Sequence, residues 1–236
     1  MPTHQCSRKL LVLIAALALT TSCASSKPKT DLTIDTLVTT EWLSQHLDDP
    51  DLVVLDCTVQ VGMDEGGGFQ ILSGRADYDG GHIPSAGFAD LLGDLSAGES
   101  PPSFAMPTPG QFSAAMGVLG VGDDSRVVLY DRMGSAWAAR VWWMLRWVGF
   151  DRAAVLDGGL GAWTAEGRPM STEPASRPAK QLTVSLRPAV IADRDEVLAA
   201  INDAGVWLID AMPESHYRGA VSYTHLTLPT TIPSWC

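Results

Sequence analysis

The sequence predicts an α/β domain with a mainly parallel central sheet flanked by helices, followed by a fragment of a second copy. Three observations support this prediction. Short, continuous apolar runs alternate with stretches of helical periodicity, the connections between them are short, and one stretch of the chain recurs. Continuous apolar runs are typical of strands buried on both faces, as in parallel sheets. Their alternation with helices indicates βαβ units.

The first elements follow in chain order. Residues 39–49 ("TTEWLSQHLDD") predict a helix, because a threonine N-cap precedes apolar residues at helical spacing. The apolar run "LVVLDC" (52–57) predicts a buried strand. Residues 108–121 ("TPGQFSAAMGVLGV") predict the next helix.

The same alternation continues through the next fifty residues. "RVVLYD" (126–131) predicts a second buried strand. Residues 135–150 predict a helix that is apolar nearly all round, and we therefore expect it to be well buried. "AAVLDGG" (153–159) predicts a third strand, and "LGAWTAEG" directly after it begins another helix.

An internal repeat follows the first domain. Residues 191–211 repeat residues 37–57 at a constant offset of 154, with apolar residues on apolar residues and an aspartate after the strand in both. The repeat resumes where "DYDG" (77–80) corresponds to "HYRG" (216–219). We expect two tandem copies of one domain, the second barely begun. Because this second helix–strand stretch lacks sheet neighbours, its apolar residues should be poorly buried.

Composition, periodicity and the repeat divide the chain into six expected parts. They are a signal peptide (1–23), a tether (24–34), a first domain (35–170), a Pro- and Ser-rich linker (171–186), the truncated start of a second domain (187–219) and a tail (220–236).

The N-terminal segment predicts export. Arg8 and Lys9 precede an apolar run over 10–19 that is too short to span a bilayer, and small residues lead to Cys23. This pattern resembles a bacterial lipoprotein box, although Thr20 stands where the box usually has leucine. We expect a periplasmic protein, anchored to the membrane only through a lipid on Cys23. Ordinary cleavage without a lipid is the alternative.

The C-terminal tail differs from the rest of the chain. From Val221 onward there is no charged residue, and the repeat breaks off. The string "VSYTHLTLPT" is the translation of DNA that resembles a transposase-end sequencing adapter. We expect residues 220–236 to be non-native, and a divergent natural C-terminus is the alternative.

Charge and cysteine content exclude some functions. The formal net charge of −11 argues against nucleic acid or an anionic membrane surface as a partner, since both require a basic face. Of the four cysteines, Cys57 alone lies in the expected folded body, so we expect no disulfide framework. We expect no cofactor and no metal.

Three stretches carry a family resemblance: "GRADYDGGHIPSAGFADL" (74–91), "VVLYDRMGSAWAARVWWMLR" (127–146) and "VLDGGLGAW" (155–163). With them the chain resembles the rhodanese family, in particular its tandem-domain thiosulfate and 3-mercaptopyruvate sulfurtransferases. The resemblance implies transfer of sulfane sulfur through a cysteine persulfide. That cysteine follows a buried strand and opens a loop whose amides converge on it, which lowers the pKa of a thiol.

The matching position in this chain is Asp131, which cannot accept a sulfane sulfur. The resemblance therefore implies a non-catalytic first domain and a reactive cysteine in the second domain, beyond the part present here. We expect no catalytic residue in this chain and no activity. For Asp131 we expect a loop-stabilising role at a helix start. A phosphoryl-transfer nucleophile is the weaker alternative, because no metal-binding carboxylate cluster accompanies it.

Other conspicuous residues have structural interpretations. His82 resembles the family's loop-tying histidine, and Cys57 is expected to be a small buried hydrophobe. The tryptophans at 137, 142, 143 and 147 are expected to pack in the core and between domains. For Arg132 and Arg140, contact with the second domain and local ion pairs both remain open.

Substrate residues follow from the resemblance. Phe104 stands where mercaptopyruvate-type members have a histidine, which favours thiosulfate. His216 and Arg218 lie where the family binds its anionic donor, although both could be surface residues. The expected partners are a small anionic sulfur donor and a thiol or cyanide acceptor. The alternative function is an exported, non-catalytic rhodanese-like binding module.

Overall fold

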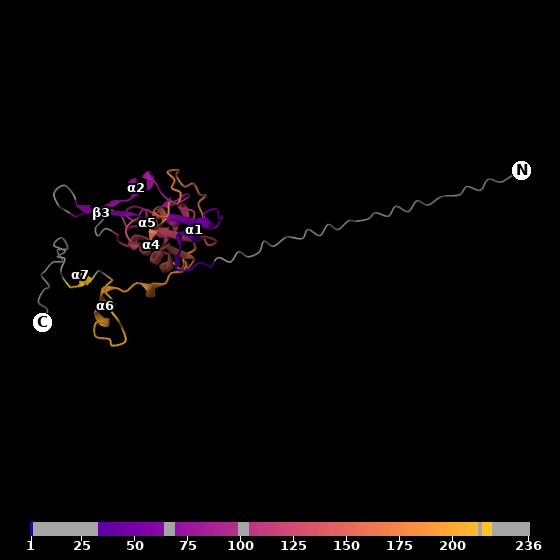
Figure 1. The fold of residues 1–236 in the computed structure, drawn as a ribbon. Coiled ribbons are helices and arrows are strands. Elements are labelled where there is room, and N and C mark those ends of the chain that lie inside the picture. Colours follow the sequence, from indigo (N-terminus) through magenta and orange to yellow (C-terminus); the bar gives the residue numbers. More distant parts are fainter. Residues whose placement is uncertain (2–32, 64–68, 99–103, 212–213, 219–236) are drawn as a thin grey trace. The chain divides into compact units, whose positions relative to one another are not determined.

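Five parallel strands form the central sheet, in the order β1-β7-β6-β2-β5 (Figure 1). The computed structural model describes residues 1, 33–63, 69–98, 104–211 and 214–218. The strands are β1 (Leu37–Val38), β2 (Leu52–Asp56), β5 (Gly87–Phe88), β6 (Arg126–Tyr130) and β7 (Ala153–Leu156). The predicted α/β fold with a parallel sheet is confirmed.

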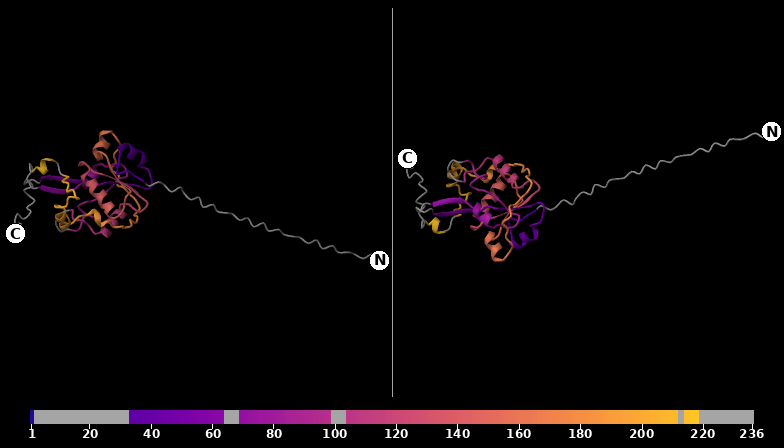
Figure 2. Two further views of the ribbon diagram at one scale, coloured as in Figure 1. Left: turned by 90° about the horizontal axis from the view of Figure 1, so that it is seen from below. Right: turned by 90° about the horizontal axis from the view of Figure 1, so that it is seen from above.

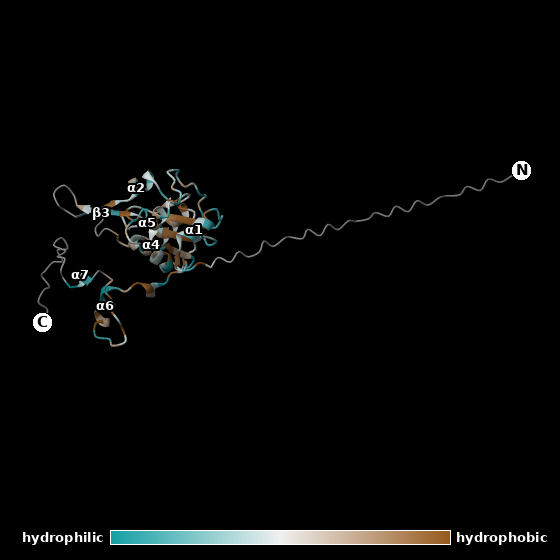
Figure 3. Ribbon diagram, in the orientation of Figure 1, coloured by the Kyte–Doolittle hydropathy of each residue, from teal (hydrophilic) through white to brown (hydrophobic). Residues whose placement is uncertain are grey.

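Helices cover both faces of this sheet, which Figure 2 shows from below and from above. They are α1 (Thr40–His46), α2 (Arg75–Gly80), α3 (Pro109–Val118), α4 (Ala136–Trp147) and α5 (Gly159–Ala165). Alternate strand residues belong to separate hydrophobic clusters. Val53 and Leu55 of β2 share one cluster with apolar side chains of α3 and α4, and Val54 shares the other with those of α1 and α5. The central strands accordingly carry the hydrophobic colour in Figure 3.

Helices α1 and α3 begin with threonine caps. The Oγ1 atom of Thr39 accepts a hydrogen bond from the backbone N–H of Trp42 at 3.1 Å, which identifies Thr39 as the cap of α1. Thr108 accepts from the N–H of Gln111 at 3.2 Å and caps α3, whose first turn contains Pro109. Within the described residues, no helix is long and apolar enough to span a membrane.

A hairpin that the sequence analysis did not predict lies beside the main sheet. Strands β3 (Val59–Met63) and β4 (Phe69–Ser73) pair antiparallel with each other and project from the layered body (Figures 1 and 2). The alternation of buried and exposed residues in β3 is incomplete, because Gly62 and Met63 are both exposed. Such a strand has no clear period to recognise.

After the linker, the described residues 187–211 and 214–218 form helices but no strand. They contain a 3₁₀ turn (Pro188–Val190), α6 (Arg194–Ala200) and α7 (Glu214–Tyr217). The bounds of α6 are those of α1 displaced by 154 residues, and α7 begins where the offset between 77–80 and 216–219 places the start of α2. The strand expected over 206–210 does not form, since no neighbouring strand is present to accept its hydrogen bonds.

Corresponding apolar residues of the two matching stretches, 37–57 and 191–211, differ in how far they are buried. Leu43 and Leu55 are fully buried, whereas Val197, the counterpart of Leu43, is 39 % exposed and Ile209, the counterpart of Leu55, is 83 % exposed. The apolar residues after the linker therefore lie at the surface, as expected for a stretch without sheet neighbours.

A partly buried charge cluster joins β6 to the turn before β2. Arg126 begins β6, and its side chain, 8 % exposed, lies 2.6 Å from carboxylate oxygens of both Asp49 and Asp51. Its guanidinium also lies 5.7 Å from the ring centroid of Trp42. Hydrogen bonding to Arg126 holds the pKa of Asp51 below its usual value. This cluster stabilises the start of two central strands.

We expect Arg126→Gln to lower the free energy of unfolding by about 2 kcal/mol at pH 7, because it leaves two partly buried carboxylates without their cation. Since the folded-state pKa of Asp51 is lowered, this stabilisation is present above the usual Asp pKa and is lost as the pH falls through the folded value. Urea unfolding at pH 7 and pH 3 measures both. Arg194→Gln is the control, because the Arg194–Asp195 pair is exposed and should contribute below about 0.5 kcal/mol. A loss at pH 3 as large as at pH 7 would contradict the prediction.

Candidate functional site

The candidate site is the loop between β6 and α4, where backbone amides converge on Asp131. The Oδ1 atom accepts hydrogen bonds from the N–H groups of Met133 at 2.8 Å and Ser135 at 2.9 Å. The Oδ2 atom accepts from those of Trp137 and Ala138, both at 2.9 Å. Asp131 is 1 % exposed, so its carboxylate is stabilised by hydrogen bonds from these amides rather than by water.

This carboxylate also caps α4. Trp137 and Ala138 are the second and third residues of the helix, and their N–H groups have no partner within it. Ser135, which precedes the helix with φ of 68°, makes no side-chain cap. A negative charge at a helix N-terminus is also favoured by the helix dipole. The interpretation of Asp131 as a loop-stabilising residue is confirmed.

The turn between β7 and α5 closes over Asp131 from the other side. The backbone N–H of Leu160 donates to the carbonyl oxygen of Asp131 at 3.0 Å. Gly159 has φ of +55°, and a Cβ atom there would lie 2.6 Å from the same carbonyl oxygen. A glycine at position 159 is therefore required for this close approach.

Arg132, next along the loop, contacts its own domain. Its Nη2 atom donates to the carbonyl oxygens of Asp77 at 3.0 Å and Gly81 at 2.5 Å, at the C-terminal end of α2. It also lies 4.0 Å from Oδ2 of Asp56. A cation at this end of a helix is stabilised by the free carbonyls. Of the two roles left open for Arg132, the structure shows the contacts within its own domain.

Two buried acids, Asp56 and Tyr130, lie beside Cys57 near the ends of β2 and β6. The Oδ1 atom of Asp56 accepts hydrogen bonds from the N–H and hydroxyl of Thr58 at 2.9 and 2.5 Å, whereas Oδ2 has no hydrogen-bond partner. Burial raises the pKa of Asp56 above its usual 3.8 and also raises that of the Tyr130 phenol. Sequence reasoning missed Asp56, although its repetition as Asp210 was a signal.

Cys57 lies in the core and not in the loop. It is fully buried, and burial raises the pKa of its thiol, with the charges of Asp56 and Asp131 adding to the effect. A thiol held neutral is a poor nucleophile. The interpretation of Cys57 as a small buried hydrophobe agrees with this geometry.

His82 ties the "GHIPSA" turn to the linker. Its ring is fully buried and stacks on Tyr78 with centroids 4.0 Å apart. Nδ1 lies 2.8 Å from the carbonyl oxygen of Tyr78, and Nε2 lies 3.0 Å from that of Glu173. The backbones of His82 and Ser171 exchange two hydrogen bonds of 2.8 Å. The expected loop-tying role is confirmed.

A second group of conspicuous residues lies on the outer side of α4. Phe104, with φ of 65°, stacks on Trp137 with centroids 5.0 Å apart. Arg140 donates to the carbonyl oxygen of Phe104, so its guanidinium is held within this domain. Trp147 packs in the core, and the indole N–H of Trp143 donates to the carbonyl oxygen of Val190 beyond the linker at 3.1 Å.

The remaining expected site residues lie outside this loop. Cys23 falls outside the described residues. Arg218 is exposed and pairs with Glu214 at 2.6 Å, one helical turn away. His216 lies on α7, where its backbone alone is described. Substrate binding by His216 and Arg218 stays a prediction.

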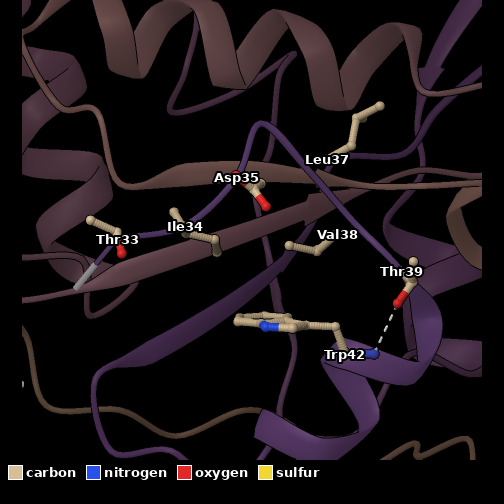
Figure 4. A pocket seen from close by; sticks show the side chains of 7 residues that line it. All are labelled: Thr33, Ile34, Asp35, Leu37, Val38, Thr39 and Trp42. Atoms are coloured by element: carbon tan, nitrogen blue, oxygen red, sulfur yellow. Dashed lines mark hydrogen bonds between the residues drawn. The ribbon is translucent and has the colours of Figure 1, made fainter. Parts of the chain in front are cut away.

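A pocket of about 310 Å³ lies at the β1 edge of the sheet, and Figure 4 shows the side chains that line it. The indole of Trp42 faces Val38 and Ile34, and the dashed line marks the Thr39 cap. Asp35 is the one titratable residue among its lining, and Asp131 is not part of it. In the part of the chain that the structure describes, no group of three His, Cys, Asp or Glu residues could hold a metal ion.

The fold and this loop define a class of protein, and comparison with known proteins identifies it. The rhodanese-like domain profile matches residues 39–166, so the chain belongs to the rhodanese family. A probable 3-mercaptopyruvate sulfurtransferase of Pseudomonas aeruginosa is 35 % identical over 193 residues, covering 78 % of this chain and 64 % of its own length. Thiosulfate sulfurtransferase of Cricetulus griseus is 30 % identical, covering 78 % and 61 %.

The structural comparison agrees. The crystal structure of SseA from Escherichia coli, a 3-mercaptopyruvate sulfotransferase with the rhodanese fold, matches with a TM-score of 0.68 and 29 % identity. The match covers 80 % of this chain and 70 % of SseA. The chain spans less than two thirds of the length of the curated sulfurtransferases to which it is similar.

Two buried aspartates at strand ends should respond differently to the same substitution. We expect Asp131→Asn to lower the free energy of unfolding by about 3 kcal/mol, since the amide NH₂ cannot accept two of the four charge-assisted hydrogen bonds. Asp56→Asn should cost less than about 1 kcal/mol at pH 7, because the amide oxygen keeps the Thr58 hydrogen bonds, and the other atom accepts no hydrogen bond and lies 4.0 Å from Arg132.

Urea unfolding of both variants against the exposed control Asp48→Asn measures the difference. Because the pKa of Asp56 is raised, its ionisation lowers the stability of the wild-type protein as the pH rises above 3.8, and Asp56→Asn should remove that decline. If the two variants lost equal free energy of unfolding at pH 7, the conclusion that Asp131 accepts more stabilising hydrogen bonds than Asp56 would be wrong.

We expect Cys57 to resist alkylation in the folded protein. Iodoacetamide at pH 7.5 should modify it at least about 100-fold more slowly than in 6 M urea, since the reagent requires an accessible thiolate. Mass spectrometry of the peptide containing Cys57 follows the reaction. Comparable rates in both conditions would show that the thiol is accessible.

Proposed function

We propose that this chain is the first, non-catalytic part of a sulfurtransferase that moves sulfane sulfur from thiosulfate (or 3-mercaptopyruvate) to cyanide or a thiol acceptor. The carrying observation is the Asp131 carboxylate, which accepts four amide hydrogen bonds at the position of the family's reactive cysteine. The loop contains no thiol, and because the carboxylate accepts the hydrogen bonds of these amides, none of them is free to bind another anion.

The persulfide-forming cysteine then belongs to a part of the relatives' length that this chain does not span. Residues 187–219 are, in this proposal, the start of the second domain, and residues 220–236 are non-native. The bounds of α6 and α7 support this, because they match those of α1 and the start of α2 at the offsets of the sequence repeat. The exposed side chains of Val197 and Ile209 would be covered by the remaining strands.

In the complete reaction, the cysteine thiolate takes the outer sulfur of thiosulfate and releases sulfite. The persulfide then passes this sulfur to cyanide, forming thiocyanate and restoring the thiolate. The apolar Phe104, stacked on Trp137, supports thiosulfate as the donor over mercaptopyruvate. His216 and Arg218 would bind the donor anion, and Arg218 would then exchange Glu214 for the substrate.

We further propose that the protein is exported to the periplasm and anchored through a lipid on Cys23. The support comes from the basic residues, the short apolar run and the small residues that precede Cys23.

A second candidate function is an exported binding module without catalysis. The same observation favours it, because Asp131 makes a stable loop that needs neither a thiol nor a bound anion. The two candidates differ in whether the parent protein has a cysteine after the second "VVLY"-like strand.

Thiocyanate formation from thiosulfate and cyanide tests the proposal. We expect this chain and its Cys57→Ser variant to show no formation above the uncatalysed rate, since Cys57 is buried and protonated. The protein recovered from the source DNA by sequencing beyond the codon for Gly219 should be active and should lose activity when its second-domain cysteine is replaced. Activity of the present chain that depends on Cys57 would refute the non-catalytic assignment. A full-length protein without that cysteine would establish the binding module.

A further inference from the structure

Arg177 has an unusual environment in the linker after α5. Its Nε atom is buried without a hydrogen-bond partner, and its Nη2 atom lies 3.5 Å from Oγ of Ser85. Among the described residues it forms no ion pair, and burial alone lowers the pKa of its guanidinium. Arg177 as a whole is half-buried, and cations that are partly withdrawn from water are generally paired, because desolvating an uncompensated charge is costly.

The other arginines show how uncommon this is in an acidic chain. Most have a carboxylate oxygen within 4.0 Å, as do Arg75, Arg126, Arg132, Arg146, Arg168, Arg187, Arg194 and Arg218. Arg140 and Arg152 instead donate to backbone carbonyls, although Nε of Arg140 is also buried without a hydrogen-bond partner. The guanidinium of Arg177 has neither kind of acceptor within the described part of the chain, although the sequence contains 27 acidic residues.

Arg177 lines a cavity of about 360 Å³. Its lining includes the hydroxyl-bearing residues Ser85, Ser171 and Ser176, and also Glu173. Oγ of Ser171 already accepts the N–H of Glu173 at 3.0 Å, which leaves its hydroxyl hydrogen to donate elsewhere. A guanidinium with several hydroxyl donors is suited to a small oxyanion.

The position of Arg177 is set by the fold. Its aliphatic stem passes over Gly120, where a Cβ atom would lie 2.9 Å from Cβ and 3.2 Å from Cδ of the arginine. His82 holds the linker on the opposite side through its contacts with Ser171 and Glu173. The cavity and its cation are therefore preorganised, which lowers the cost of binding.

We propose that this cavity, the Arg177 pocket, binds a small tetrahedral oxyanion of the sulfate or phosphate class. The ligand supplies the missing counter-charge: its oxygens accept from the guanidinium and from the serine hydroxyls. Glu173 opposes binding, because its carboxylate lines the same cavity. The proposal does not depend on sulfur transfer, since Asp131 takes no part in the pocket.

Titration of the full chain with sodium sulfate and sodium phosphate, at an ionic strength held constant with sodium chloride, tests the proposal. The side-chain Nε–Hε signal of Arg177 in a ¹H–¹⁵N spectrum should shift saturably with either anion. Arg177→Met should weaken binding at least about 10-fold, the effect of losing one charge-assisted hydrogen bond. Glu173→Gln should strengthen it, and the exposed control Arg194→Gln should leave it unchanged.

Two results would overturn the proposal. One is an Arg177 signal that responds to sulfate and phosphate no more than to chloride, a measurement on the wild-type chain that does not require the variants to fold. The other is an affinity for sulfate that Arg177→Met and Glu173→Gln leave unaltered. Equal binding of acetate would refute selectivity for a tetrahedral anion.

Discussion

The hydrogen bonding of one carboxylate organises the functional end of this domain. Asp131 joins three segments: the end of β6, the first turn of α4 and, through its carbonyl oxygen, the turn that begins α5. The first two flank Asp131 in the sequence, whereas the third lies further along the chain, and the amides that donate to Asp131 would otherwise be unsatisfied in a buried position. Since the charge is surrounded by N–H donors, its burial is compensated without a cation. The geometry of the loop follows from this arrangement.

The same hydrogen bonds to Asp131 also determine which anions the loop can bind. Amides converging at a helix N-terminus form a site for an anion, either a thiolate or a bound ligand. Here the chain supplies that anion itself through a side chain that has no sulfur chemistry. Asp56 lies nearby with one oxygen that accepts no hydrogen bond, and Cys57 is shielded in the core. The loop therefore holds a carboxylate where its amides converge, and the thiol of Cys57 lies outside it.

Local pattern predicts part of this structure and misses the rest. Strands β2, β6 and β7, the long helix α4 and the Asp131 cap follow from apolar runs and the position of an aspartate before a helix. The two-residue strands β1 and β5 carry no periodic signal, and the β3–β4 hairpin lacks clear alternation. The contact of Arg132 with α2, and the lack of an ion pair at Arg177 among the described residues, depend on which distant segments the fold brings together. The sequence around each arginine does not specify this.

The repeated stretch separates local from tertiary determinants within one chain. At 194–200 the sequence forms a helix, with Asp193 and Glu196 completing a capping box, even though its apolar face is exposed. At 206–210, where the first copy has β2, the backbone forms no strand. A helix satisfies its hydrogen bonds internally, whereas a strand requires a neighbour. In the first copy β6 and β5 provide those neighbours, so β2 is a consequence of the assembled sheet as much as of its own apolar sequence.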